Sequence, residues 1–270
     1  MTSGPASLFL FLHDSPPEWD DELNRYFDFD HVPDRISCAG WGRAERFERS
    51  VVEPAEPAPA DRAPRYLYFH ELDSLDALTS DARRHYGPSP WARAQREADG
   101  AVPVAPVRGY RTAWRQRASP WQGAQVFHAP APRAIHVVLR DVAPGHAVEA
   151  NRYLDEVLVP ELLSCPGFLR CERYEAGPAL PSTSGSPEFA PPSLLDVFDV
   201  ASPEVLTSEV YRARAASPAR EPDDVRAHLS TRLHAVYVQR PSPWAVDVID
   251  AGARTSARDD TSRDAGPRHN

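Results

Sequence analysis

The sequence predicts an α+β protein made of two tandem copies of one folding unit, and three observations support this fold class. Residues 24–48 recur 127 positions later as residues 151–175, and 13 of the 25 aligned pairs are identical. Chance at average residue usage would give about one or two identities. The hydrophobic patterns of each half run in the order strand, helix, strand, strand, helix, strand. The two copies also end alike, with QRASPW at 116–121 and QRPSPW at 239–244.

Each element of the unit has its own local signal. The expected strands cover residues 8–13, 41–49, 65–72 and 107–116 in the first unit and 135–140, 168–175, 193–200 and 233–239 in the second. The first helix begins near Pro16 and Pro17, because proline suits a first helical turn, and it ends around Pro33 or one turn later. Gly40 then breaks the chain before the second strand. A serine followed by acidic residues predicts a second helix after each third strand. The two copies of this signal are SLDALTSD at 74–81 and SPEVLTSE at 202–209.

This order of elements is the split βαβ, or ferredoxin-like, unit, a four-stranded antiparallel sheet with both helices on one face. The other face of such a sheet stays apolar and uncovered. We therefore expect the two sheets to pack face to face as an intramolecular α+β barrel. The expected boundaries are 1–121 for the first unit, 122–134 for a linker, 135–249 for the second unit and 250–270 for a disordered tail.

Composition excludes several classes of protein. A net charge of −9 over 270 residues, without a basic stripe, argues against a nucleic-acid or membrane partner. The three cysteines show no C-x-x-C and no Cys/His cluster, so we expect no metal site and no disulfide framework. Gly-rich phosphate loops and the G-x-S-x-G and H-E-x-x-H motifs do not occur. The apolar run Leu8–Leu12 is too short for a signal or a membrane span, so the cytoplasm is the expected location.

Alternation along the strands predicts which side chains share a face. An aliphatic set is expected to pack against the helices and comprises Leu8, Leu10, Leu12, Ile135, Val137 and Leu139. The opposite faces of the first and third strands are expected to line the space between the two sheets. Aromatic walls with a few convergent polar groups suit a pocket for an aromatic or polyketide-like molecule. The expected substrate-binding residues are Phe9, Phe11, His13, Tyr66, Tyr68, Arg140, Asp196 and Phe198, with His70 and His136 on the same faces.

Structural roles for these polar residues are left open. His13 and Arg140 can be solvated at strand ends, and His136 can be a satisfied core histidine. Asp196 can form an internal ion pair with Arg140 or His136. The two units also differ in this set, which favours a chemically equipped pocket in only one of them. The second unit has Asp196 and Phe198 at the positions of Tyr68 and His70.

The repeat contains motifs that point beyond the fold. The second copy has NRYLD at 151–155, VP at 159–160, PGF at 166–168 and RY at 173–174. The first copy keeps DHVP at 30–33, whereas Leu158 replaces the histidine in the second. These motifs resemble the EthD-like group of dimeric α+β barrel proteins. The resemblance implies small-molecule enzymes that often need no cofactor, such as polyketide cyclases, lactone isomerases, quinone-forming monooxygenases and decarboxylases. More distant relatives bind haem.

His31 is the first candidate for chemistry, because a histidine near the end of a helix can act as a general base near neutral pH. The alternative is a structural histidine bonded to a backbone carbonyl. Tyr26 lies five residues earlier, about 140° away around a regular helix. The two side chains are therefore not expected to share a face unless the helix bends. Tyr26 is expected to pack, with its hydroxyl tethering a neighbouring loop.

The leading hypothesis is a cofactor-independent cyclase, isomerase, decarboxylase or monooxygenase that acts on an aromatic or polyketide-like substrate between the sheets. His31, or His70 and His136, would remove a proton from an activated carbon. Tyr68 or Arg140 would hold the developing oxyanion. The rival is a non-catalytic protein that binds a hydrophobic ligand, and haem binding comes third. The expected partner is a small molecule, and pairing of two chains as a homodimer is left open.

Overall fold

The computed structural model describes residues 7–55, 62–78, 108–117, 121–122, 132–178, 180, 192–216, 225 and 227–241. Three predictions lie largely or wholly outside these residues and stay predictions. They are the linker at 122–134, the tail at 250–270 and the second helix of the first unit beyond residue 78.

The described residues form the predicted elements in both units. The first unit contains β1 (Ser7–Asp14), the 3-10 turn η1 (Pro17–Trp19), α1 (Asp20–Tyr26), the π-helical turn η2 (Phe27–His31), α2 (Val32–Ile36), β2 (Trp41–Arg49), β3 (Tyr66–Leu72), η3 (Leu75–Leu78), β4 (Arg108–Gln116) and the short β5 (Trp121–Gln122). The second contains β6 (Ala134–Val142), α5 (Ala147–Tyr153), the π-helical turn η4 (Leu154–Leu158), α6 (Val159–Leu163), β7 (Phe168–Ala176), β8 (Leu194–Val200), η5 (Pro203–Thr207), α7 (Glu209–Ala215) and β9 (Leu229–Gln239). Among the described helices, none has the length and apolar character needed to cross a membrane.

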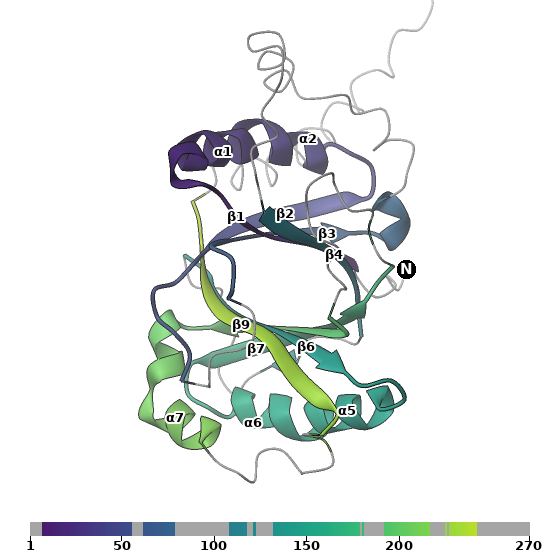
Figure 1. Cartoon of the computed structure of the whole chain (residues 1–270), viewed down its shortest axis with the longest axis vertical. Helices are drawn as coiled ribbons and strands as arrows, with labels where there is room; N and C mark the ends of the chain where they lie inside the picture. The colour runs from purple at the N-terminus through teal and green to yellow at the C-terminus, as the bar shows by residue number, and fades with distance from the viewer. Residues whose placement is uncertain are drawn as a thin grey trace, which may run out of the picture.

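Eight of the described strands close into one antiparallel barrel. Their order is β4-β1-β3-β2-β9-β6-β8-β7, and β4 pairs again with β7 to complete the ring. The two units meet at two seams, β2 with β9 and β4 with β7 (Figure 1). The short strand β5 extends the sheet beyond β7. The predicted fold, two ferredoxin-like units that form an intramolecular α+β barrel, is therefore confirmed.

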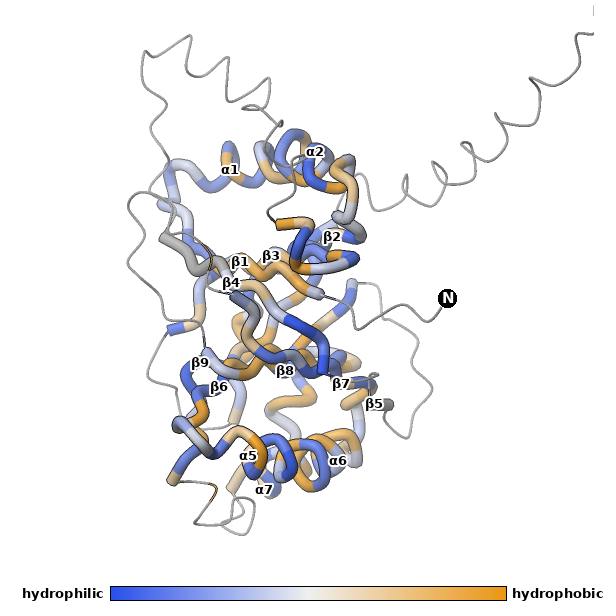
Figure 2. The backbone as a smooth tube through the Cα atoms, turned by 90° about the vertical axis from the view of Figure 1, so that its right-hand side faces the viewer, coloured by the Kyte–Doolittle hydropathy of each residue, from blue (hydrophilic) through white to orange (hydrophobic). Residues whose placement is uncertain are grey.

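Apolar side chains fill the inside of the barrel, and Figure 2 shows hydrophobic segments concentrated along the strands. The interior cluster includes all six members of the aliphatic set that was expected to pack against the helices: Leu8, Leu10, Leu12, Ile135, Val137 and Leu139. That prediction is wrong, because the two faces of the strands are exchanged. Alternation could not choose between the faces, since β1 is buried at seven consecutive positions and is covered on both sides.

The helices cover the outer faces of the barrel, with α1 and α2 over the first sheet and α5, α6 and α7 over the second (Figure 1). The long helix of each unit is interrupted by a π turn at the same position of the repeat. In these turns the N–H of Val32 donates to the carbonyl of Phe27, and the N–H of Val159 donates to that of Leu154. Each of these bonds reaches five residues back, which widens the helix locally.

One arginine ties the helix to the sheet in each unit. Arg46 on β2 donates to the side-chain oxygen of Asn24 at 2.6 Å and to the carboxylate of Asp28. The same three residue types make the same contacts in the second unit, where they are Asn151, Asp155 and Arg173. We call these two groups the first and second clamps. All three residue pairs are identities of the repeat, so the duplication has kept a structural tie.

Candidate active site between the first sheet and its helix

The histidine and aromatic side chains predicted in the first unit lie between its sheet and its helix. We call this group the histidine layer, and its members are Phe9, Phe11, His13, Phe27, His31, Trp41, Tyr68 and His70. The strand register sets their order. On β3, His70 lies opposite Phe9 of β1, and Tyr68 lies between Phe11 of β1 and Arg46 of β2. The expected position between the two sheets is wrong, because the strand faces that point into the barrel carry the aliphatic side chains.

His31 ends the π turn, and its ring meets that of Tyr26. The Tyr26 hydroxyl lies 3.2 Å from His31 Nδ1. A π turn places residues five apart on one face of the helix, whereas a regular helix separates them. The two side chains were expected to meet only if the helix departs from regular geometry, and the π turn is that departure. Tyr26 also packs against the apolar core of the first unit, and the tether to a loop stays a prediction. The His31 ring also borders the layer, with its centroid 5.2 Å from that of Phe27 and 6.0 Å from that of Tyr68.

His13 is buried in an aromatic stack. Its ring centroid lies 4.8 Å from that of Phe11, 5.1 Å from that of Phe27 and 5.3 Å from that of Tyr66. Burial in this stack lowers the pKa of His13 to about 3, and the charge of Arg46 adds to the lowering. The imidazole is therefore neutral at pH 7, and the alternative of a solvated His13 is wrong.

His70 and Tyr68 meet edge to face on β3. Their ring centroids are 4.5 Å apart, and the His70 ring lies 4.8 Å from that of Trp41. The Trp41 indole is fixed by a hydrogen bond from Nε1 to the carbonyl of Ala77 at 3.2 Å. Burial lowers the pKa of His70 to about 3, and the charge of Arg35 contributes. His70 is thus a second neutral imidazole in the layer.

Several buried polar atoms of the histidine layer have no protein partner within the described ranges. These atoms are both ring nitrogens of His13, both ring nitrogens of His70 and the hydroxyl of Tyr68. Leaving such a group unsatisfied costs about 1–3 kcal/mol, and folded proteins rarely do so. Three such side chains lie in one layer. This arrangement is expected where a bound ligand supplies the missing hydrogen bonds.

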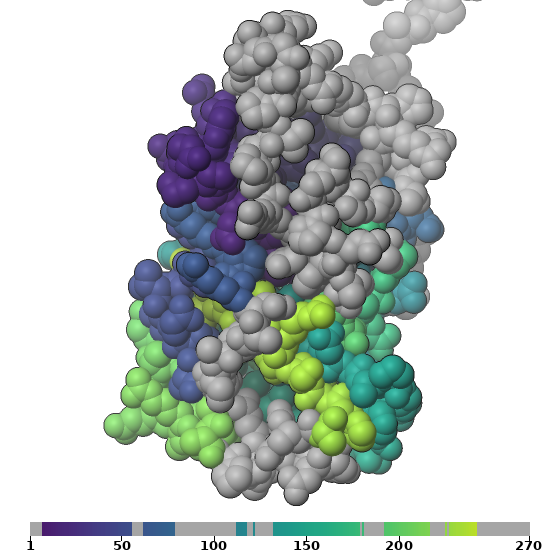
Figure 3. Space-filling model, viewed as in Figure 1, coloured from purple at the N-terminus to yellow at the C-terminus, as the bar shows by residue number. Residues whose placement is uncertain are grey.

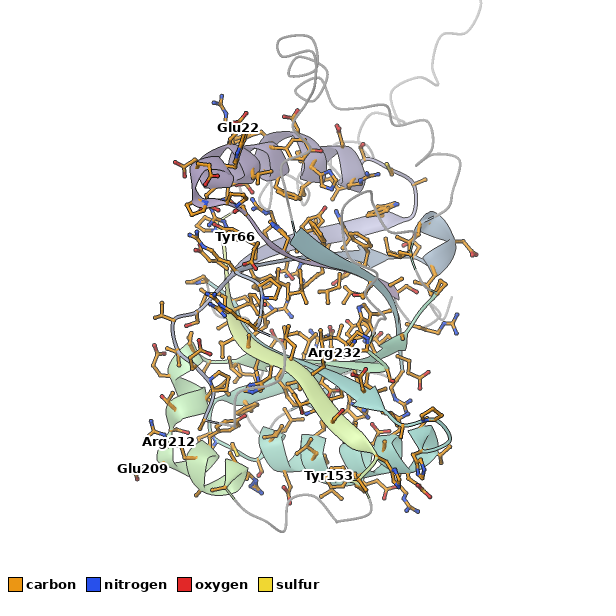
Figure 4. The ribbon with its side chains drawn as sticks, viewed as in Figure 1. Glu22, Tyr66, Tyr153, Glu209, Arg212 and Arg232 are labelled. Carbon is orange, nitrogen blue, oxygen red and sulfur yellow. The ribbon has the colours of Figure 1, made fainter. Side chains whose placement is uncertain are left out.

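Tyr66 lies at the edge of the layer and is already engaged. Its hydroxyl donates to the carboxylate of Asp20 at 2.7 Å and accepts from the amide of Asn24 at 3.3 Å. These contacts connect β3 to α1, and Figure 4 shows Tyr66 between the strand and the helix. The substrate-binding role expected for Tyr66 stays a prediction.

The second unit fills the equivalent layer with an ion pair, apolar groups and one buried histidine, His136. Arg140 donates to the carboxylate of Asp196, which also accepts from Arg173 Nε at 2.8 Å. The alternative of an internal ion pair is therefore confirmed, and neither Arg140 nor Asp196 belongs to the histidine layer. All eight positions of the histidine layer differ between the units. Its histidine and tyrosine residues, His13, His31, Tyr68 and His70, correspond to Arg140, Leu158, Asp196 and Phe198, and Phe9 corresponds to His136.

His136 lies in the second unit, on the opposite side of the barrel from His31 and His70. Its ring stacks on that of Phe198 at 6.0 Å and meets that of His234 edge to face at 6.1 Å. The structure therefore does not bring the three expected catalytic histidines together. No group of three or more His, Cys, Asp or Glu side chains in the described chain could hold a metal ion.

Sequence reasoning missed Phe27, Trp41 and Arg46 as parts of this site. A signal for Arg46 was available, because it is identical between the copies together with Asn24 and Asp28. An arginine and a carboxylate on the preceding helix that are both kept between the copies are typical of a buried ion pair.

A separate groove runs over the β2–β9 seam. Figure 3 shows residues of β9 at the surface between the two units. The groove has a volume of about 350 Å³ and is lined by Glu48, Arg49, Ser50, Val238, Gln239, Arg240 and Pro241. None of these residues belongs to the histidine layer, so the groove adds no group to the candidate site.

Comparison with solved structures agrees with the fold described above. No family model and no curated protein sequence matches the chain. An anthrone oxidase-like protein superposes with a TM-score of 0.56 over 89% of this chain and 93% of that chain, at 13% identity. A mutant chlorite dismutase from Candidatus Nitrospira defluvii gives a TM-score of 0.54 over 93% of this chain and 97% of that chain, at 9% identity. The chain thus shares the closed α+β barrel fold of the dimeric α+β barrel proteins.

Proposed function

We propose that this chain is a cofactor-independent monooxygenase-type enzyme whose aromatic, polyketide-like substrate binds in the histidine layer of the first unit. One observation carries the proposal. The buried polar atoms of His13, Tyr68 and His70 have no partner among the described residues, whereas Arg140 and Asp196, at the positions of His13 and Tyr68 in the second unit, pair with each other. The anthrone oxidase-like neighbour shares only the fold, and its name supplies a substrate class to test.

The layer offers both kinds of contact that a planar polar ligand needs. Phe9, Phe11 and Trp41 give aromatic area for stacking. The Tyr68 hydroxyl and the neutral His70 ring, 4.5 Å apart between centroids, would bind oxygen atoms on the ligand. The ligand would then supply hydrogen-bond partners for the buried polar atoms of Tyr68 and His70.

We assign the general base to His31. Burial holds the pKa of His13 and His70 at about 3, so these two rings are weak bases and act better as neutral hydrogen-bond partners. His31 is half-buried, and its Nδ1 is engaged by Tyr26 at 3.2 Å. When Nδ1–H donates to the Tyr26 oxygen, Nε2 is the proton acceptor. His31 would use this tautomer to take a proton from a carbon between two aryl rings.

The reaction needs no external reductant. Loss of a proton from an aryl CH₂ group gives a carbanion that transfers electrons to O₂. One oxygen atom becomes the carbonyl oxygen of the quinone product. The other leaves as water with the two hydrogens that the carbon has lost, so the substrate supplies all the electrons.

The test measures O₂ uptake and quinone absorbance with an anthrone that carries a free CH₂ group. Turnover by the wild type, with a fall in kcat of about 10²- to 10⁴-fold in His31→Ala, is the expected result. His146→Ala is the matched control, because His146 lies at the start of α5 in the second unit and outside the layer. Equal kcat values for His31→Ala and the wild type would overturn the assignment.

Two further outcomes identify the rival functions. Saturable quenching of tryptophan fluorescence by the anthrone without O₂ uptake would indicate a non-catalytic binding protein. A Soret band in the purified protein would indicate haem.

A further inference from the structure

We infer that Arg46 is the positioning residue of the histidine layer: it fixes the π turn that carries His31 and places a positive charge beside His13. The inference deepens the proposed function, and only its catalytic readout rests on that function.

The first part of the inference follows from the contacts of the guanidinium. The Arg46 side chain is 2% exposed and reaches from β2 to the helix. It donates to the Asn24 carbonyl at 3.2 Å, to the Asn24 side-chain oxygen at 2.6 Å and to the Asp28 carboxylate. Asn24 precedes Tyr26, and Asp28 lies inside the π turn. Arg46 therefore holds the backbone on both sides of Tyr26, and a planar fork suits this task better than a point charge.

The second part follows from the ring beneath the guanidinium. Arg46 Cζ lies 5.0 Å from the centroid of the Phe27 ring. The Phe27 ring in turn lies 5.1 Å from His13, 5.2 Å from His31 and 5.8 Å from Tyr68, measured between centroids. Phe27 is thus the central ring of the layer, and Arg46 packs against it from the side of the sheet.

The electrostatic part concerns His13. The charged and titratable groups that face it are Arg46 from β2, Asp20 from α1 and Tyr66 from β3. Arg46 lowers the pKa of His13 and Asp20 raises it. Removing the Arg46 charge therefore favours protonation of His13.

The duplication provides an internal control for a merely structural role. Arg173 makes the second clamp with Asn151 and Asp155, but its layer carries Leu158 in place of His31. Loss of either arginine removes a tie between helix and sheet. Only loss of Arg46 should change the histidines of the first unit.

The experiment compares Arg46→Lys and Arg46→Met with Arg173→Lys and Arg173→Met in the full-length chain. The primary readout is the side-chain ¹⁵N spectrum of the histidines, titrated with pH, and the secondary readout is kcat with an anthrone.

Arg46→Met should raise the pKa of His13 and change the Nδ1 chemical shift of His31. Arg46→Lys keeps the charge but loses the fork, so it should change the His31 shift and leave the pKa of His13 low. Both Arg46 variants should lose about tenfold or more in kcat, by the loss of base positioning.

The Arg173 variants should lose stability but keep the wild-type spectra of His13 and His31. Equal effects of the Arg46 and Arg173 variants on these spectra would overturn the inference, and so would an unchanged His31 signal in Arg46→Lys. If Arg46→Met does not fold, Arg46→Lys carries the test, because it keeps the charge and most of the side chain. If the wild type does not turn over anthrone, the proposed function fails while the spectra still decide the role of Arg46.

Discussion

Tyr26 and His31 are five residues apart in the sequence, yet the tyrosine hydroxyl lies 3.2 Å from the histidine Nδ1. The π turn between them makes this contact, since it brings positions five apart onto one face. The second unit has the same π turn with Tyr153 and Leu158 at these positions. The turn is therefore a property of the repeated unit, and the histidine is what distinguishes the first copy.

Deletion and insertion in the π turn should have opposite effects on the Tyr26–His31 contact. Deleting the exposed Phe29 gives a regular helix in which the two residues are four apart and still share a face, so the contact and the activity should persist. Inserting an alanine after Asp28 makes them six apart and should abolish both. The same insertion after Asp155 in the second unit is the control and should leave the activity intact. Activity assays and the His31 ¹⁵N shift check these outcomes, and an active insertion variant would contradict the role of the turn.

Acid should destabilise the protein through His13 and His70. Burial lowers the pKa of both from 6.5 to about 3, so the unfolded chain binds more protons than the folded chain between these pH values. The free energy of unfolding should therefore fall as the pH drops below 6.5, by about 1.4 kcal/mol per pH unit for each histidine. Above pH 6.5 the two histidines add no slope.

The variant His70→Phe separates this effect from other titrations, because phenylalanine is the residue at the same position of the second unit. We expect it to remove about half of the histidine slope in urea unfolding curves measured from about pH 5 to pH 7. An unchanged slope would mean that His70 titrates normally in the folded protein.

Truncation of Leu10 tests the corrected assignment of the strand faces. Leu10 is 1% exposed inside the barrel, so Leu10→Ala should lower the free energy of unfolding by about 2–5 kcal/mol. Ligand binding per folded molecule should not change, because the histidine layer lies on the other face of β1. Val148→Ala, at a position that is 82% exposed, should stay within about 0.5 kcal/mol of the wild type. Urea unfolding of both variants gives the comparison.

Arg133 joins the two units through buried carboxylates, and its removal should be severe. It contacts Glu45 of the first unit at 2.5 Å and Asp199 of the second at 3.1 Å. Arg133→Met takes its cation from the buried Asp199 and leaves Glu45 with Arg43 and Gln239, so it should cost about 3–5 kcal/mol. Adding Glu45→Gln and Asp199→Asn should restore most of that loss. If the triple variant is no more stable than Arg133→Met, the carboxylates are not the source of the cost.

The fold could be predicted from the sequence because the same pattern of strands and helices is written twice in the chain. Two copies of the same strand order, with 13 identities in the 25 aligned pairs around the first helix, define the unit twice. The bare face of each sheet then predicts closure of the barrel. The choice of face was not accessible in the same way, because strands such as β1 and β8 are buried on both sides.

The residue types of the candidate site could be predicted from the sequence. Its position between the sheet and the helix could not. His13, Tyr68 and His70 were selected by alternation, which groups side chains correctly but does not say which face meets the helices. The contact of Tyr26 with His31 depends on the π turn, and no residue in 27–31 signals such a turn by its chemistry.

Closure of the barrel has a consequence for how the chain is made. Glu48 and Arg240, 192 residues apart, form an ion pair at 2.7 Å beside the β2–β9 seam. Until the strands of the second unit leave the ribosome, the first sheet has no partner for its apolar face, and the edge of β2 stays unpaired until β9 follows. The growing first half is therefore exposed to self-association during translation, and its completion waits for the last strand of the barrel to be synthesised.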